Sequence, residues 1–174
     1  TIDSGADHAD LTDEYAAMPI EMKKVAAFFG KEVLREVDEQ EFYAKIAEIR
    51  KETGDRAALR AMHFFDENRR VQMQVRALKN DNFAAFLNYV NESGNASWEL
   101  LQNITPLGAT AHQEMALTLA LCRKLLGGEG AVRVHGGGFA GTVLAFVSNE
   151  KFGQFKNAID SAIGNGRTQE LHIR

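Results

Sequence analysis

Residues 131–147 read AVRVHGGGFAGTVLAFV, and this stretch decides the fold. Val132 and Val134 alternate with other residues, glycines follow within 136–141, and an unbroken apolar run occupies 143–147. This order predicts a strand, a tight glycine turn and a buried second strand. Consecutive glycines weaken a strand, so they indicate positive φ angles or a close approach of another body to the backbone.

The glycines of this turn are the candidate site, and they are Gly136, Gly137, Gly138 and Gly141. A row of N–H groups without side chains beside them can bind an anion. The spacing alone leaves open an ordinary hairpin that carries glycines for its geometry. A choice between the two interpretations therefore needs a second motif.

The composition is that of a globular chain without a basic face. The chain has 174 residues, of which 45% are hydrophobic, and a formal net charge of -4. Nucleic acids and anionic membranes bind basic surfaces, so we expect neither as a partner. Apolar runs are far shorter than a membrane span and no signal-peptide pattern occurs, which favours a cytoplasmic protein. The single cysteine, Cys122, lies in an apolar helical pattern and is expected to be a buried structural thiol.

The first residues indicate a fragment. The chain begins Thr1-Ile2-Asp3 without a methionine, and this β-branched start runs directly into polar residues. Such a start is expected of a chain that has been cut within a strand. The sequence contains no internal repeat or Pro-rich linker, so we expect residues 1–174 to form a single domain.

Residues 3–14, DSGADHADLTDE, are acidic and turn-rich, and we expect an exposed loop. Its potential metal ligands are Asp3, Asp7, His8, Asp10 and Asp13. The spacing lacks the glycine and final glutamate of a calcium loop, and one histidine with scattered aspartates is not a zinc set. We therefore predict no metal site. Tyr15 ends this stretch, and its ring is expected to be a packing plug or a ligand contact.

Helical periodicity dominates the rest of the chain. It predicts helices from Pro19 to Gly30, over 38–53, over 56–79, from Phe83 to near Gly94, over 105–126 and from Ser148 to Gly164, with a short strand or link at 33–37 and a final strand at 168–173. On the longest helix, His63 and Asn68 are expected to be hydrogen-bonded core residues rather than catalytic ones. The pattern as a whole predicts an α+β fold, a small antiparallel sheet with helices packed on one face.

Several blocks in order resemble the galactokinases of the GHMP kinase superfamily. Residues 133–147, RVHGGGFAGTVLAFV, resemble the third GHMP motif in its galactokinase form, R-M-T-G-G-G-F-G-G-C. Asp13-Glu14-Tyr15, followed by FFGKEVLREV at 28–37, resembles S-E-Y and L-G-K-E-x-L-R-[DE]-V at matching separation. Residues 60–70, RAMHFFDENRR, resemble R-A-x-H-[VF]-x-x-E-N-x-R, and 78–86 approach L-x-x-G-D-[FY]-x-x-[FM].

This resemblance implies the C-terminal domain of a sugar kinase, ferredoxin-like with extra helices, without the N-terminal ATP-binding domain. The family transfers the γ-phosphoryl group of MgATP to the C1 hydroxyl of galactose, in a cleft between its two halves. Its phosphate loop and catalytic Asp belong to the N-terminal half, so we expect no catalytic residue here, and no activity or bound ATP or Mg²⁺ for this chain alone. The resemblance also implies that Tyr15 contacts the sugar and that the loop of Gly136 to Gly141 borders the reacting groups.

The sequence departs from the family pattern around the sugar side. His135, Ala140 and Thr142 replace a threonine, a glycine and a cysteine, and 18–20 replace an arginine pair. The native sugar and the oligomeric state are therefore open. Another GHMP small-molecule kinase, or a non-catalytic galactokinase-like sensor or interaction module, is the alternative. A hydrolase would use H-G-G-G as its oxyanion loop, but the G-x-S-x-G that it requires is absent from the sequence.

Overall fold

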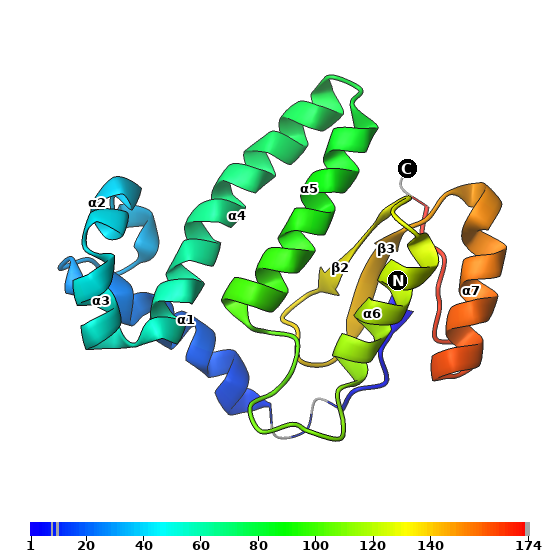
Figure 1. Ribbon diagram of the computed structural model, residues 1–174, viewed down its shortest axis with the longest axis horizontal. Coiled ribbons are helices and arrows are strands. Elements are labelled where there is room, and N and C mark those ends of the chain that lie inside the picture. The colour runs from blue at the N-terminus through cyan, green and yellow to red at the C-terminus, as the bar shows by residue number, and fades with distance from the viewer. Residues whose placement is uncertain (8, 10, 173–174) are drawn as a thin grey trace.

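The computed structural model describes residues 1–7, 9 and 11–172. Within this part, a three-stranded antiparallel sheet is surrounded by helices, and the predicted α+β class is confirmed (Figure 1). The elements in chain order are β1 (Ile2–Asp3), α1 (Thr12–Phe28), α2 (Glu39–Ala44), α3 (Ile46–Thr53), α4 (Asp55–Lys79), α5 (Phe83–Ala96), α6 (Glu114–Leu126), β2 (Ala131–His135), β3 (Thr142–Phe146) and α7 (Asn149–Ile163). A 3₁₀ turn (Leu34–Glu36) and a π-helical turn (Ser97–Leu101) complete the list.

The sheet has the order β1-β3-β2, so the glycine hairpin provides two of its strands. Val143 of β3 lies opposite Val134 on one side and Ile2 on the other. This face of the sheet packs against α6 and α7, as predicted, through a core of Ile2, Met115, Leu119, Cys122, Leu126, Val132, Val134, Val143, Phe155 and Ile159. Cys122 is fully buried, as expected of a structural thiol, and burial raises its pKa to about 12.

A second apolar core lies to the side of the sheet, where α1, α2, α3 and α4 meet (Figure 1). Its buried residues are Val25, Ala26, Leu34, Val37, Phe42, Ile49, Ala57, Ala58, Ala61 and Phe65. Each belongs to the apolar stripe of its own element, and burial of these stripes supplies the main stabilisation of this layer. Helix α4 contributes Ala57, Ala58, Ala61 and Phe65 to this second core and packs along α5.

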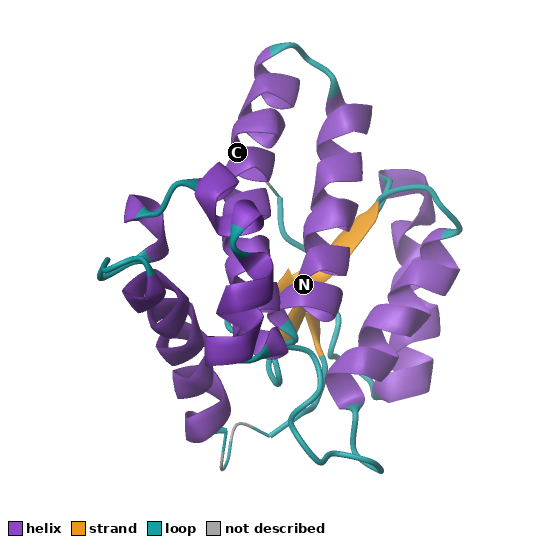
Figure 2. Cartoon of the chain, turned by 60° about the vertical axis from the view of Figure 1, so that its left-hand side comes forward, coloured by secondary structure: helices purple, strands orange, loops and turns teal. Residues whose placement is uncertain are grey.

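Helix α5 lies along the free edge of β2, and α4 and α5 form a long helical hairpin beside the sheet (Figure 2). The Asn91 amide pairs with this edge, accepting from the Val132 N–H at 3.0 Å and donating to the Gly130 carbonyl at 3.1 Å. The predicted helix end near Gly94 was wrong, because this glycine permits close approach instead. A Cβ at Gly94 would lie 2.7 Å from the Val132 carbonyl oxygen.

The exposed loop expected over 3–14 is shorter than predicted, because α1 begins at Thr12 and Pro19 lies inside the helix. Buried Leu11 packs with Phe139 and anchors the first turn, and the Tyr15 N–H donates to the Leu11 carbonyl. The acidic residues that suggested a loop suit the positive end of the helix dipole. His8 and Asp10 of the expected loop lie outside the described residues.

Three other boundaries also differ from the prediction. The helix expected over 38–53 is divided at Lys45 into α2 and α3, and the segment at 33–37 contains a 3₁₀ turn rather than a strand. Helix α6 begins at Glu114 rather than at 105. The intervening loop includes Gly108 at φ +79°, which a helix does not permit, and Leu107 is tied back to Glu14 of α1 through its N–H.

The strand expected over 168–173 was also wrong for the described residues up to 172. Only an isolated bridge joins Thr168 to Ile2. The outward backbone groups of Thr168 are taken by α7, with the N–H donating to Asp160 and the carbonyl accepting from Lys156. Ile173 lies outside the described residues. None of the described helices has both the length and the apolar character needed to cross a bilayer.

Candidate functional site

The glycine loop, residues 136–141, connects β2 to β3 in a conformation that ordinary side chains disfavour. Gly136, Gly138 and Gly141 have φ angles of +81°, +87° and +85°. Phe139 adopts φ +56° although it is not a glycine, and its side chain is 2% exposed. Positive φ in a bulky residue is a strained conformation that tertiary contacts must hold. The glycines therefore serve the backbone conformation of this loop.

Three carbonyl oxygens of the loop are held from different segments of the chain. The Gly137 carbonyl accepts from Asn103 Nδ2 at 3.0 Å, and the Gly138 carbonyl accepts from the Tyr15 hydroxyl at 2.8 Å. The Gly141 carbonyl accepts from the N–H and the hydroxyl of Ser4, at 2.9 and 2.7 Å. These contacts fix the peptide planes of the loop.

Tyr15 and the glycine loop, which the sequence analysis selected independently, lie in direct contact. Beyond its hydroxyl bond to Gly138, the Tyr15 ring meets the Phe139 ring edge-on, with centroids 5.6 Å apart. A Cβ on Gly137 would lie 2.9 Å from Tyr15 Cε1, so the missing side chain makes room for the ring. Burial raises the pKa of Tyr15 above its ordinary value, which keeps the hydroxyl protonated and able to donate near neutral pH.

The outer side of the loop presents backbone donors. Gly136 and Gly137 are exposed, and within the described residues no acceptor takes their N–H groups. A Cβ at Gly136 would meet nothing within 4 Å, so the space beside it is open. Exposed N–H groups that no acceptor takes within the described residues, beside carbonyls that are already bound, have the chemistry that binds an anionic oxygen.

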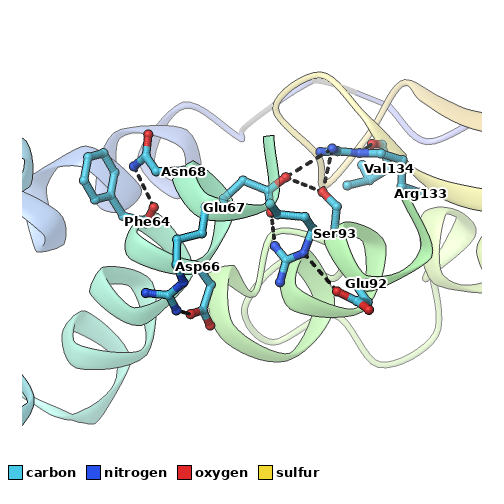
Figure 3. A network of polar contacts seen from close by, with 10 residues as sticks. Phe64, Asp66, Glu67, Asn68, Glu92, Ser93, Arg133 and Val134 are labelled. Atoms are coloured by element: carbon cyan, nitrogen blue, oxygen red, sulfur yellow. Dashed lines mark hydrogen bonds and ion pairs between the residues drawn. The ribbon is translucent and has the colours of Figure 1, made fainter. Parts of the chain in front are cut away.

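A half-buried polar network joins the strand before the loop to the α4/α5 hairpin (Figure 3). Arg133 of β2 donates to the Ser93 hydroxyl at 2.6 Å and to the Val134 carbonyl at 3.0 Å. Its guanidinium also lies 3.5 Å from Glu67, which pairs with Arg70. The network ties α4 and α5 to β2 immediately before the glycines.

His63 and Asn68, the two polar residues of α4 that were expected to lie in the core, are surrounded by other parts of the helical layer and not by the glycine loop. His63 is buried next to this network, and burial lowers its pKa against the opposing charge of Glu67. Asn68 Nδ2 donates to the Phe64 carbonyl at 2.7 Å within the same helix (Figure 3). Within the described residues, neither side chain hydrogen-bonds to the glycine loop. His63 Nδ1 is buried without a hydrogen-bond partner there and Asn68 is only half-buried, so the expectation of hydrogen-bonded core residues is not met in full at either position.

Asn103, which holds the Gly137 carbonyl, was missed by the sequence analysis. The residue belongs to no recognised block, and a lone asparagine after an apolar turn gives no local signal. Its role depends on a contact across 34 positions of the chain. The π-helical turn at Ser97–Leu101 could have provided a hint, because such turns are frequent at functional sites, but it was not predicted either.

Metal ligands do not gather in the described part of the chain, where no group of three His, Cys, Asp or Glu side chains could hold an ion. A cavity of about 270 Å³ borders Phe139 on the side of Pro106 and Met115. A larger one, of about 580 Å³, lies at the far end of β3, beside α7 and both chain ends. Of the glycine loop only Phe139 borders a cavity, whereas Tyr15 and the loop's glycines line neither of the two.

Comparisons by sequence and by structure both find galactokinases. The chain is 31% identical over 150 residues to the galactokinase of Glaesserella parasuis and 30% identical over 158 residues to that of Mannheimia succiniciproducens. These matches cover 86% and 91% of the chain. The chain is similar to galactokinases over most of its own length. It spans about two fifths of the length of these relatives, since it covers 37% and 39% of them.

The fold agrees with that relationship. A crystal structure of Lactococcus lactis galactokinase complexed with galactose superimposes with a TM-score of 0.71 at 21% identity, over 93% of this chain and 40% of that one. No protein-family model matches the chain. The resemblance that the sequence motifs indicated is thereby confirmed, and so is the fold that it implied.

Proposed function

We propose that the chain is the C-terminal domain of a galactokinase, which transfers the γ-phosphoryl group of ATP to the C1 hydroxyl of galactose. One observation supports this assignment above all. The Tyr15 hydroxyl lies 2.8 Å from the Gly138 carbonyl, so two galactokinase-like motifs separated by 123 residues meet at one surface. The galactose named for the Lactococcus lactis relative supports the choice of sugar.

In this proposal the chain supplies one wall of the active site. Tyr15 presents an aromatic edge and its hydroxyl oxygen to the sugar, the oxygen as an acceptor because its proton is donated to Gly138, and both are held in place by Phe139 and Gly138. The N–H groups of Gly136 and Gly137 donate to the anionic oxygens near the reacting phosphate. Phosphoryl transfer depends mainly on positioning and on charge stabilisation, so fixed backbone donors are useful contributions.

The remaining parts of the reaction belong to the N-terminal half that the proposal requires. The described residues of this chain offer no group of three His, Cys, Asp or Glu side chains that could hold Mg²⁺. ATP would meet this chain only at the glycine loop. We therefore expect the 174-residue chain alone to lack kinase activity, and we expect a soluble enzyme of the cytoplasm.

The test joins this chain to the N-terminal half of the Glaesserella parasuis galactokinase and measures ADP release with a panel of hexoses. We expect release that depends on galactose, and none from either half alone. Absence of release with every hexose, from a joined protein with a cooperative unfolding transition, would contradict the kinase assignment. Galactose binding without turnover would instead support the non-catalytic sensor, which the replacements at His135, Ala140 and Thr142 suggest.

A further inference from the structure

Asn103 reaches the glycine loop from its inner side with two separate groups. Its Nδ2 donates to the Gly137 carbonyl at 3.0 Å, and its own backbone carbonyl accepts from the Phe139 N–H at 2.6 Å. The residue is 2% exposed, so the contact is shielded from water. A shielded hydrogen bond fixes geometry well, because leaving either partner unsatisfied is costly.

The close approach of Asn103 also explains one of the glycines. A Cβ at Gly138 would lie 2.0 Å from the Asn103 carbonyl oxygen and 2.5 Å from Nδ2. No side chain fits into that space. The loop and Asn103 therefore constrain each other, and the strained φ of Phe139 is held by the bond to its N–H.

Asn103 is itself positioned from the helical layer. It follows the π-helical turn Ser97–Leu101 and Gln102, whose φ is +57°. Buried Arg60 of α4 donates from Nε to the Leu101 carbonyl at 3.0 Å, and its Nη1 lies 2.8 Å from Glu21 of α1. Helix α1 therefore contacts the loop directly through Tyr15 and is linked to it indirectly through Glu21 and Arg60.

We propose that Asn103 is a positioning residue for the site, which fixes the peptides at Gly137 and Gly138 so that the N–H groups of Gly136 and Gly137 face the ligand. The orientation of its amide is determined, because only the NH₂ group can donate to the Gly137 carbonyl. The effect on turnover rests on the proposed kinase function, whereas the effect on the loop does not.

The chain offers a matched control in Asn91. Its amide is also bonded to the backbone of the β2–β3 hairpin, but at the opposite end, at Gly130 and Val132. Asn103→Leu and Asn91→Leu each replace an amide by an apolar group of similar shape. Asn103→Asp, examined at pH 8, serves as a second variant in case the leucine prevents folding.

The first readout is the ¹H–¹⁵N spectrum of the 174-residue chain. We expect Asn103→Leu to shift or broaden the amide signals of Gly136, Gly137 and Gly138, and Asn91→Leu to leave them in place. The second readout is the joined kinase, where Asn103→Leu should lower kcat with galactose at least about tenfold, because misplacing groups at the reacting centre is costly. The Asn91→Leu variant should change kcat less than about twofold.

Two results would overturn the inference. Loop signals that are unchanged in both Asn103 variants would show that the amide does not fix the loop. Shifted loop signals with an unchanged kcat would show that the fixed conformation has no role in turnover. If the unmodified joined protein phosphorylates no hexose, the kinase proposal fails, and the spectra alone then decide whether Asn103 positions the loop.

Discussion

Gly136 and Gly138 are required to be glycine for different physical reasons. Gly136 and Gly138 both have positive φ angles, but only Gly138 faces the Asn103 backbone. We expect Gly136→Ala to lower the free energy of unfolding by about 1 kcal/mol, the cost of a left-handed alanine. For Gly138→Ala we expect a loss above about 3 kcal/mol, since overpacking adds to that cost. Urea denaturation of both variants measures the difference, and equal losses would contradict the close approach.

His63 provides a pH-dependent test of the half-buried network at the residue scale. Burial lowers its folded-state pKa below the ordinary value, with Glu67, Arg70 and Arg133 as the charged groups nearby. The unfolded chain therefore binds the proton more readily, so the stability is fully present above about pH 6.5 and is lost as the pH falls. We expect thermal melts from pH 7 to pH 5 to show this loss, and His63→Gln to reduce it. Exposed His112→Gln is the control, and an identical pH slope in His63→Gln would refute the interpretation.

At the scale of elements, the ion pair between Glu21 of α1 and Arg60 of α4 supports the turn that carries Asn103. Arg60 is 1% exposed and joins Glu21 to the turn that presents Asn103. Removing one partner of a buried pair costs about 3–5 kcal/mol, because the other charge is left without compensation. We expect Glu21→Gln to cause a loss in this range in urea denaturation. Glu41→Gln, which breaks the exposed pair with Lys45, should cost less than about 1 kcal/mol.

The elements also show what the sequence could and could not predict. The hairpin strands and the longest helix followed from periodicity. The family resemblance implied only that Tyr15 and the glycine loop lie near the same sugar, and the two are in direct contact. The start of α1 was missed because acidic residues suit both an exposed loop and a helix N-terminus, and the buried Leu11 that anchors this turn is a tertiary contact. Gly94 was also misinterpreted because of a tertiary contact. The sequence predicted a helix end near this glycine, whereas the glycine permits close packing of α5 on β2. Asn103 was missed because its partners are remote in sequence.

For the whole molecule, the packing of the start of α1 against the glycine loop explains how one surface is assembled from distant segments. Helix α1 belongs to the helical core, yet its first turn packs on the loop of the sheet core through Leu11 and Phe139. The exposed outer side of the loop is then available to a second half of the protein. In the proposed kinase, the sugar and the phosphate lie between these two halves.

The most direct measurement of the central claim is the Michaelis constant of the joined kinase for each substrate after Tyr15→Phe. We expect the KM for galactose to rise about three- to tenfold, the value of one hydrogen bond, with the KM for ATP unchanged. Tyr43→Phe, on α2 and away from the loop, is the control and should change neither constant. A rise in the KM for ATP, or no change in either constant, would contradict the assignment of Tyr15 to the sugar site.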